Sequence, residues 1–271
     1  MEHRDRYLEL NLHPETEASV QPHIYVNHIY KYVYIPMGKI ASTSVISALS
    51  DGELPHGKAK NTGKSSTGLL KIRRPKKLSH YYKDYFIFAF VRHPFDRLVS
   101  LYHNLLRNAK RQDYFRKKYG LAKKLSFSDY LLKILSSKHI DYHYELQYVH
   151  LVDSLVDLSN QPEVVNFIGY FENLEEDFNK IIQKIGLPYQ KYYKLPKRGS
   201  SRPKKTTADY FDYFDPILAS RAFIFYKKDF IRFGYKPSNT LFLNPEVHMV
   251  QDNLSQSKNK LKKYKNELTN F

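Results

Sequence analysis

Residues 34–45, YIPMGKIASTSV, constrain the fold most strongly. An apolar run ends at a Gly-Lys turn and is followed at once by small hydroxyl residues, which predicts a strand, a turn and a helix beginning between Ser42 and Ser44. The first N–H groups of a helix lack backbone acceptors and lie at its positive end, so they favour an anion, and Lys39 adds a full charge. The segment therefore predicts a phosphate or sulfate site. A plain strand-turn-helix junction with a solvated Lys39 is the alternative.

A second segment, residues 84–107, repeats this architecture. An aromatic and β-branched run is broken at Pro94 and gives way to a helical pattern with leucines on one face. Arg92 ends the predicted strand, and Ser100 falls inside the predicted helix. Because Pro94 forces a turn between them, we expect both side chains to meet a second anionic group near the first.

The two segments, in this order, resemble the nucleotide-binding elements of the sulfotransferases that use 3′-phosphoadenosine 5′-phosphosulfate (PAPS). That family holds the 5′-phosphosulfate with a Lys-x-(Gly/Ala)-(Ser/Thr/Cys)-Thr loop and the 3′-phosphate with an Arg-x-Pro-x-x-Arg-x-x-Ser element. Residues 92–100, RHPFDRLVS, match the second element, so the resemblance assigns Arg92 and Ser100 to the 3′-phosphate. The residues that match the first element are Lys39, Ile40, Ala41, Ser42, Thr43 and Ser44.

Two later segments resemble the carbohydrate branch of that family: residues 163–178, EVVNFIGYFENLEEDF, and residues 221–235, RAFIFYKKDFIRFGY. Between them, His143-Tyr144 stands where that branch carries a His-Trp pair. The resemblance implies an enzyme that moves a sulfuryl group from PAPS to a hydroxyl of a carbohydrate acceptor. Tyr144 in place of Trp and His93 in place of a commonly acidic residue are departures, and they leave the acceptor open.

The expected chemistry is electrostatic. In-line transfer builds negative charge on the oxygen that bridges to the departing bisphosphate, and Lys39 and the helix N-terminus are aimed there, so no metal is expected. The acceptor hydroxyl needs a base, for which His143 is the first candidate and Glu172 the alternative, since an ordinary imidazole titrates near physiological pH. Three further residues are expected in a loop that closes on the 3′-phosphate: Arg198, Gly199 and Ser200.

Strands are predicted at residues 29–36, 84–92 and 163–171, each followed by a helical pattern. This order predicts a parallel sheet with helices on both faces, and the resemblance implies a P-loop-like α/β fold. Three helices have clear end signals. They are residues 127–136 with Ser126 as N-cap, residues 174–185 ending at Gly186, and a long helix that Asp215-Pro216 opens and that ends near Gly234.

The chain divides into an N-terminal extension (1–23), a single sulfotransferase-like domain (24–237) and a C-terminal tail (238–271). Apolar residues in the tail recur at alternating three- and four-residue steps, which predicts an amphipathic helix lying on the domain, with a coiled-coil homodimer as the alternative. No apolar run approaches the ~20 residues that span a bilayer. The sequence has no cysteine and its first residues do not resemble a signal peptide, so we expect a cytoplasmic enzyme without stable membrane insertion.

The formal net charge of +17 is concentrated in three basic runs, residues 58–77, 110–124 and 197–205. The first and third are expected at the mouth of the active site, where positive charge concentrates an anionic cofactor or an acidic glycan. A basic module that binds nucleic acid or another polyanion is the rival interpretation, but it leaves the two anion elements unexplained. A nucleotide-dependent kinase is a second rival, and it would need a divalent metal.

Overall fold

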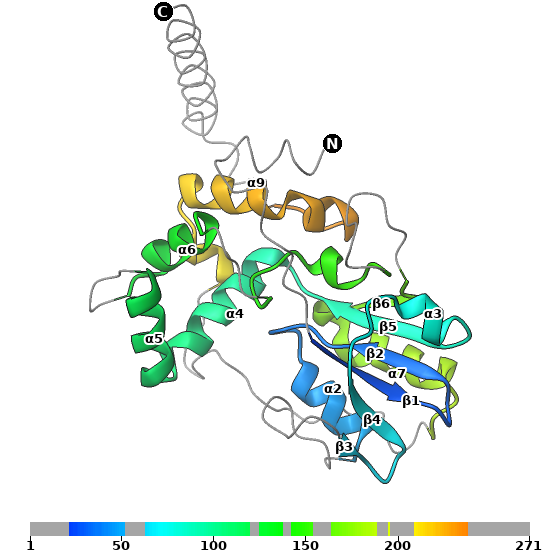
Figure 1. Ribbon diagram of the computed structural model, residues 1–271. Coiled ribbons are helices and arrows are strands. Elements are labelled where there is room, and N and C mark those ends of the chain that lie inside the picture. The colour runs from blue at the N-terminus through cyan, green and yellow to red at the C-terminus, as the bar shows by residue number, and fades with distance from the viewer. Residues whose placement is uncertain are drawn as a thin grey trace, which may run out of the picture.

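The computed structural model describes residues 22–51, 63–119, 125–137, 142–153, 164–188, 195 and 209–237. These residues form an α/β domain around one six-stranded sheet of order β3-β4-β1-β2-β5-β6 (Figure 1). Its strands are β1 His23–Asn27, β2 Tyr32–Ile35, β3 Gly63–Lys64, β4 Leu69–Arg73, β5 Phe86–Val91 and β6 Phe167–Tyr170.

The three predicted strands are β2, β5 and β6, and they are parallel neighbours. The other half of the sheet is antiparallel, because β1 pairs with both β2 and β4, and β3 pairs with β4. The sheet is therefore mixed, and the prediction of a parallel sheet is wrong for this half. In the parallel half the carboxyl ends of β2, β5 and β6 share one edge, which is where open α/β sheets place their ligands.

The β1–β2 hairpin explains why one predicted strand began too early. Residues Ile29 and Tyr30 are apolar, yet they lie in the turn, where both of their N–H groups donate to Oδ1 of Asn27 at 3.0 Å. Lys31 then turns the chain with a φ of 48°. An asparagine side chain that competes for backbone donors thus overrides the strand propensity of the two residues that follow.

Part of the first basic run, residues 58–77, forms a strand. Its residues 69–73, LLKIR, form β4, which pairs with β1 in a register that sets Tyr25 opposite Lys71. Two positive charges within five residues mask the strand pattern in the sequence. In the structure Lys71 is 5% exposed, and its strand pairs with β1 on one side and with β3 on the other.

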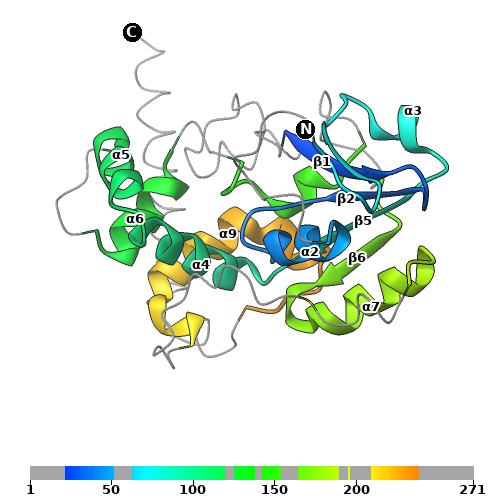
Figure 2. The same ribbon diagram turned by 90° about the horizontal axis from the view of Figure 1, so that it is seen from below.

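The helices are α2 Ser42–Leu49, α3 Leu78–Tyr82, α4 Pro94–Leu106, α5 Ala109–Tyr119, α6 Phe127–Leu135, α7 Leu174–Lys184 and α9 Pro216–Arg232. The described residues also include three short 3-10 turns, η1 Gln147–His150, η2 Phe171–Asn173 and η3 Tyr210–Tyr213. In both views α4, α5 and α6 gather beyond one end of the strands, and in Figure 2 α2 and α7 lie on the same side of β1, β2 and β5. The expectation that helices cover both faces of the sheet remains a prediction.

The predicted helix ends are confirmed. Ser126 Oγ accepts from the N–H of Asp129 at 3.0 Å, and Asp215 Oδ1 accepts from the N–H of Leu218 at 2.7 Å. Gly186 follows α7 with a φ of 71°, a conformation that glycine adopts without strain. The N-terminal extension up to residue 21 and the tail from residue 238 lie outside the described residues, so the tail helix and the homodimer stay predictions.

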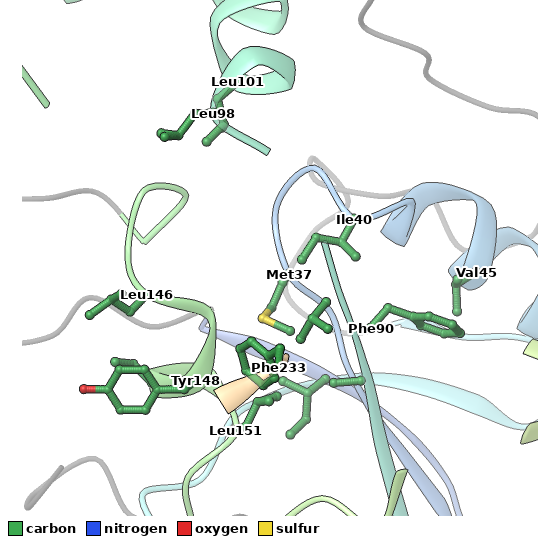
Figure 3. Packing of buried hydrophobic residues seen from close by; sticks show 14 of the residues in the cluster. Met37, Ile40, Val45, Phe90, Leu98, Leu101, Leu146, Tyr148, Leu151 and Phe233 are labelled. Carbon is green, nitrogen blue, oxygen red and sulfur yellow. The ribbon is translucent and has the colours of Figure 1, made fainter. Parts of the chain in front are cut away.

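Two buried apolar side chains anchor the loop between β2 and α2 to the core. Met37 and Ile40, on either side of the Gly-Lys turn, are 1% and 0% exposed and belong to one buried cluster with Val45 and Phe90 (Figure 3). Burying two apolar side chains within four residues of loop ties its backbone to the sheet. The polar part of the loop is thereby presented at the carboxyl edge of β2 in a fixed position.

Candidate active site

The loop after β2 has the backbone of an anion-binding turn. Lys39 and Ala41 adopt left-handed angles, with φ of 69° and 52°, which non-glycine residues rarely do. Successive N–H groups in such turns form concave nests for anions. Ala41 is also the N-cap of α2, and its methyl side chain makes no capping hydrogen bond. The N-cap position of the helix therefore lacks the hydroxyl or carboxylate that such positions usually carry.

The hydroxyl of Ser42 shapes the loop itself. Its Oγ donates to the carbonyl of Met37 at 2.5 Å, and Ser42 also bonds the hydroxyl of Tyr34. Burial raises the pKa of Tyr34 well above its usual range, and the bond with Ser42 opposes part of that rise. Ser42 and Ser44 are 4% and 5% exposed, whereas Lys39 and Thr43 are half-buried. The loop thus offers an anion its backbone N–H groups and the Lys39 side chain more than its serine hydroxyls.

Arg92 joins the second predicted element to this loop. Its Nη1 donates to the carbonyl of Lys39 at 2.8 Å, and its Nε donates to Oδ2 of Asp96 at 2.7 Å. The guanidinium carbon lies 4.0 Å from the centroid of the Phe171 ring. Arg92 is 7% exposed, and these bonds use two of the five N–H donors that a guanidinium carries. The structure therefore brings Lys39 and Arg92 together, as the sequence predicted.

Gln147 holds the backbone of Arg92 from both sides. Its Oε1 accepts from the N–H of Arg92 at 2.9 Å, and its Nε2 donates to the carbonyl of Arg92 at the same distance. Asp229 of α9, fully buried, accepts from the N–H groups of Gln147 and Tyr148 at 2.7 and 3.0 Å. Burial raises the pKa of Asp229 to about 6, against the opposing effect of these hydrogen bonds. A continuous series of buried hydrogen bonds thus runs from Asp229 in α9 through Gln147 in η1 to Arg92.

Ser100 and Arg97 extend the second element into α4. Ser100 is 2% exposed in that helix, so it can contact a phosphate only if the phosphate itself is buried in the protein. Arg97 is also 2% exposed, and its three nitrogens donate to three carbonyls. Those acceptors are Gly38 at 3.3 Å, Glu145 at 2.8 Å and His143 at 2.7 Å. Arg97 therefore connects the anion loop to the segment that carries the candidate base.

His143 lies directly against the loop. A Cβ atom built on Gly38 would come within 2.7 Å of Cδ2 of the His143 ring, so only glycine allows this approach. The side chain is half-buried, and its ring centroid is 4.0 Å from that of Tyr142. The imidazole thus neighbours the residue before Lys39, which places a group able to accept a proton beside the loop.

The neighbouring Tyr144 points elsewhere. Its ring packs edge-on against the buried Tyr130 at 6.0 Å, and its carbonyl accepts from the hydroxyl of Tyr226 at 2.6 Å. This packing makes Tyr144 a poor candidate for stacking against a sugar ring, the role that the His-Trp pair of the resembling branch implies for this position. His150 and His103 are also buried: His150 is 1% exposed, and His103 is 9% exposed and bonds the hydroxyl of Tyr213 at 2.7 Å.

Both carboxylate oxygens of Glu172 are engaged. Oε1 accepts from the N–H of His93 at 2.8 Å, and Oε2 accepts from the hydroxyl of Tyr235 at 2.9 Å. Burial raises the pKa of Tyr235 far above its usual range, and the Glu172 charge raises it further. Glu172 therefore links the Arg92-His93 turn to Tyr235, just after α9. Because both of its oxygens already accept hydrogen bonds, His143 is favoured over Glu172 as the base.

His93 serves as the N-cap of α4. Its Nδ1 accepts from the N–H of Phe95 at 3.3 Å, so its Nε2 carries the proton and donates to the carbonyl of Lys236 at 3.2 Å. The ring is enclosed by aromatic side chains that include Tyr210 and Tyr235, and burial lowers its pKa. A neutral histidine can thus replace the acidic residue common in the resembling family, because Nδ1 supplies the cap.

Arg198, Gly199 and Ser200 lie outside the described residues, so their assignment stays a prediction. Within the described part of the chain, no group of three or more His, Cys, Asp and Glu side chains could hold a metal ion. None of its helices is both long enough and apolar enough to cross a bilayer.

Sequence reasoning missed three residues that hold the site together: Arg97, Gln147 and Asp229. Arg97 lies in the motif at residues 92–100 and Asp229 in the motif at residues 221–235, so their positions in these motifs could have indicated a role in the site. Gln147 has no local pattern, because its role depends on the contact between η1 and the end of β5.

Comparisons with known proteins agree with this geometry. A family model described as Sulfotransferase family matches residues 22–236. Carbohydrate sulfotransferase 14 of Danio rerio is 28% identical over 249 residues, covering 85% of this chain and 66% of that protein. Carbohydrate sulfotransferase 11 of Mus musculus is 25% identical over 247 residues, covering 82% of this chain and 69% of that protein. Carbohydrate sulfotransferase 10 of Xenopus laevis is 23% identical over 256 residues. No solved structure gives a significant match.

The match therefore spans about two thirds of the length of these curated relatives, 66% and 69% for the first two. The expected cytoplasmic location gains no support from the fold or from these names and stays a prediction. The resemblance to sulfotransferases, and within them to proteins named carbohydrate sulfotransferases, is confirmed. By the family match over most of its length, the chain belongs to the sulfotransferase family.

Proposed function

We propose that this protein transfers a sulfuryl group from PAPS to a hydroxyl of a carbohydrate acceptor. The observation that carries the proposal is the 2.8 Å bond from Arg92 Nη1 to the carbonyl of Lys39. It joins two elements that lie far apart in the sequence, one suited to a 5′-phosphosulfate and the other to a 3′-phosphate. Family membership and the names of the relatives support the same reaction.

The residues fit such a nucleotide. The left-handed turn at Lys39 and Ala41, followed by the start of α2 with an N-cap residue that has no capping side chain, suits a P-loop-like cradle for the 5′ end. Arg92, held by Asp96 and Gln147, presents a fixed guanidinium for the 3′-phosphate, with Ser100 further along α4. Charge-assisted bonds of this kind are the strong ones in phosphate recognition.

PAPS, when bound, supplies an activated sulfuryl group. The Lys39 charge and the positive end of α2 then stabilise negative charge on the departing oxygen, and because the loop is fixed by its buried side chains this requires little reorganisation. His143, half-buried against Gly38, accepts the proton of the acceptor hydroxyl. Arg92 and Ser100 bind the 3′-phosphate and take no part in the making or breaking of bonds.

A carbohydrate acceptor is favoured by the names of the relatives and by the carbohydrate-branch segments of the sequence. The net charge of +17 favours an acidic glycan among them, because a positive surface raises the local concentration of anions. We keep the cytoplasmic location and the absence of nucleic-acid and metal partners as parts of this proposal.

The binding of adenosine 3′,5′-bisphosphate tests the donor half of the proposal. A sulfotransferase should bind one equivalent by calorimetry, and transfer of labelled sulfate from PAPS to a panel of glycans should persist in a chelator. A nucleic-acid module should instead prefer oligonucleotides, with an affinity that falls steeply with salt. Transfer that requires a divalent metal and ATP would point to a kinase.

A further inference from the structure

Arg97 occupies an unusual position for a charged residue. It is 2% exposed, and its bonds go to the carbonyls of Gly38, Glu145 and His143 and not to a carboxylate. Burying a guanidinium is costly unless its donors are satisfied. Burial lowers the pKa of Arg97, while Tyr226, Asp229 and Glu145 oppose this effect. The cost of burial indicates that the link it makes has a function.

That link runs between two segments that share no element. Gly38 belongs to the loop between β2 and α2, and His143 lies just before η1. Arg97 donates from Nε to the first and from Nη2 to the second, so one rigid planar group fixes the distance between their backbones. The same two residues also lie side by side, because a Cβ atom built on Gly38 would come within 2.7 Å of Cδ2 of the His143 ring.

We propose that Arg97 is a positioning residue that sets the His143 imidazole at its working distance from the Lys39 loop. The inference rests on the proposed function, in which the loop holds the sulfuryl donor and His143 is the base. Proton transfer and in-line attack depend steeply on distance, so a base displaced by about 1 Å is expected to cost about 100-fold in rate. Arg97 would thus act on turnover and not on nucleotide binding.

Arg97→Lys tests this directly, because an ammonium keeps the charge but cannot span three carbonyls. We expect kcat to fall by about 10- to 100-fold, while the Kd for adenosine 3′,5′-bisphosphate changes by less than about 3-fold. In a His143→Ala background the same change should cost almost nothing further, because the group that it positions is gone. Equal effects of Arg97→Lys in both backgrounds would overturn the proposal.

Arg74 provides a matched control. It is 7% exposed and donates to the carbonyls of His150 and Val152 at 2.6 and 2.8 Å, at the other end of the same segment. Arg74→Lys should lower the melting temperature with little change in kcat. If it lowers kcat as Arg97→Lys does, the effect reflects general loosening of the segment, and the proposal fails.

Gly38→Ala keeps the test decisive if Arg97→Lys does not fold. The added Cβ would lie 2.7 Å from His143 Cδ2, so the ring must move although every Arg97 bond can remain. We expect the same loss of kcat and the same absence of a further effect on His143→Ala. An unchanged kcat in Gly38→Ala would overturn the proposal. A wild type that neither binds the bisphosphate nor transfers sulfate would instead refute the proposed function itself.

Discussion

Arg92 Nη1 donates to the carbonyl oxygen of Lys39 at 2.8 Å, although the two residues lie 53 positions apart. The bond makes the expected 3′-phosphate residue a support of the expected 5′ loop. We therefore expect recognition of the two ends of the proposed nucleotide to be coupled, because removing Arg92 removes a phosphate contact and also releases the loop.

This coupling predicts different effects for Arg92→Ala and Ser100→Ala. Arg92→Ala should weaken binding of both adenosine 3′,5′-bisphosphate and adenosine 5′-monophosphate, whereas Ser100→Ala should weaken only the bisphosphate. Bonds to charged groups contribute about 1.5 to 3 kcal/mol, so each affected Kd should rise by about 10-fold or more. Calorimetry with both nucleotides measures this, and Arg107→Ala, an exposed arginine just after α4, should change neither Kd. Equal losses for both nucleotides in Ser100→Ala would mean that Ser100 is structural.

His143→Ala should leave the affinity for the bisphosphate intact and lower kcat by about 10² to 10⁴. It should also abolish the acidic limb of the pH–rate profile, since an imidazole must be neutral to accept a proton. His80→Ala, at an exposed position in α3, should keep both the rate and the profile. If His143→Ala keeps the acidic limb and most of the activity, the base is another group.

Glu172→Gln should act on stability and not on the pH–rate profile. In Glu172 a charged carboxylate accepts both the 2.8 Å bond from the N–H of His93 and the 2.9 Å bond from the hydroxyl of Tyr235. The amide of glutamine is neutral and has one acceptor oxygen, so it cannot replace both bonds. We expect a loss of about 1 to 3 kcal/mol in the free energy of unfolding, measured by urea denaturation. Loss of the acidic limb in this variant would instead make Glu172 the base.

Asp229 should make stability fall as the pH rises through the acidic range. Its pKa rises on folding from 3.8 to about 6, so between these values the folded protein binds more protons than the unfolded chain. The free energy of unfolding then decreases with rising pH, by about 3 kcal/mol in all for a shift of about two units. Relative to Asp229→Asn, the wild type should lose this much between about pH 4 and pH 7.

Urea denaturation across that range checks the Asp229 prediction. Asp84→Asn, an exposed carboxylate between α3 and β5, should give a curve parallel to that of the wild type. If the curve for Asp229→Asn is also parallel, burial does not raise the pKa of Asp229 as described.

Local patterns predicted the parts of the site that local chemistry determines. The turn at Lys39 and the strand end at Arg92 follow from glycine, proline and hydroxyl residues next to apolar runs, and the structure places both where the parallel strands end. The helix caps at Ser126 and Asp215 were readable for the same reason.

Contacts between distant segments could not be predicted in this way. Gln147 holds Arg92 only because Asp229 fixes the start of η1, and nothing near Gln147 in the sequence indicates either partner. The antiparallel half of the sheet was missed because Asn27 turns an apolar pair into a hairpin and because lysine and arginine interrupt the pattern of β4.

The most direct test of the central claim is sulfate transfer from labelled PAPS to acidic glycans by the wild type, Lys39→Ala and Lys31→Ala. Lys31 is the matched control, because it precedes β2 as Lys39 follows it and also has a positive φ, 48° against 69°. Since charge on the departing oxygen grows mainly in the transition state, Lys39→Ala should lose at least about 100-fold in kcat with a smaller loss of bisphosphate affinity. Lys31→Ala should transfer as the wild type does. Transfer by Lys39→Ala at the rate of Lys31→Ala, or no transfer by the wild type to any acceptor, would contradict the account.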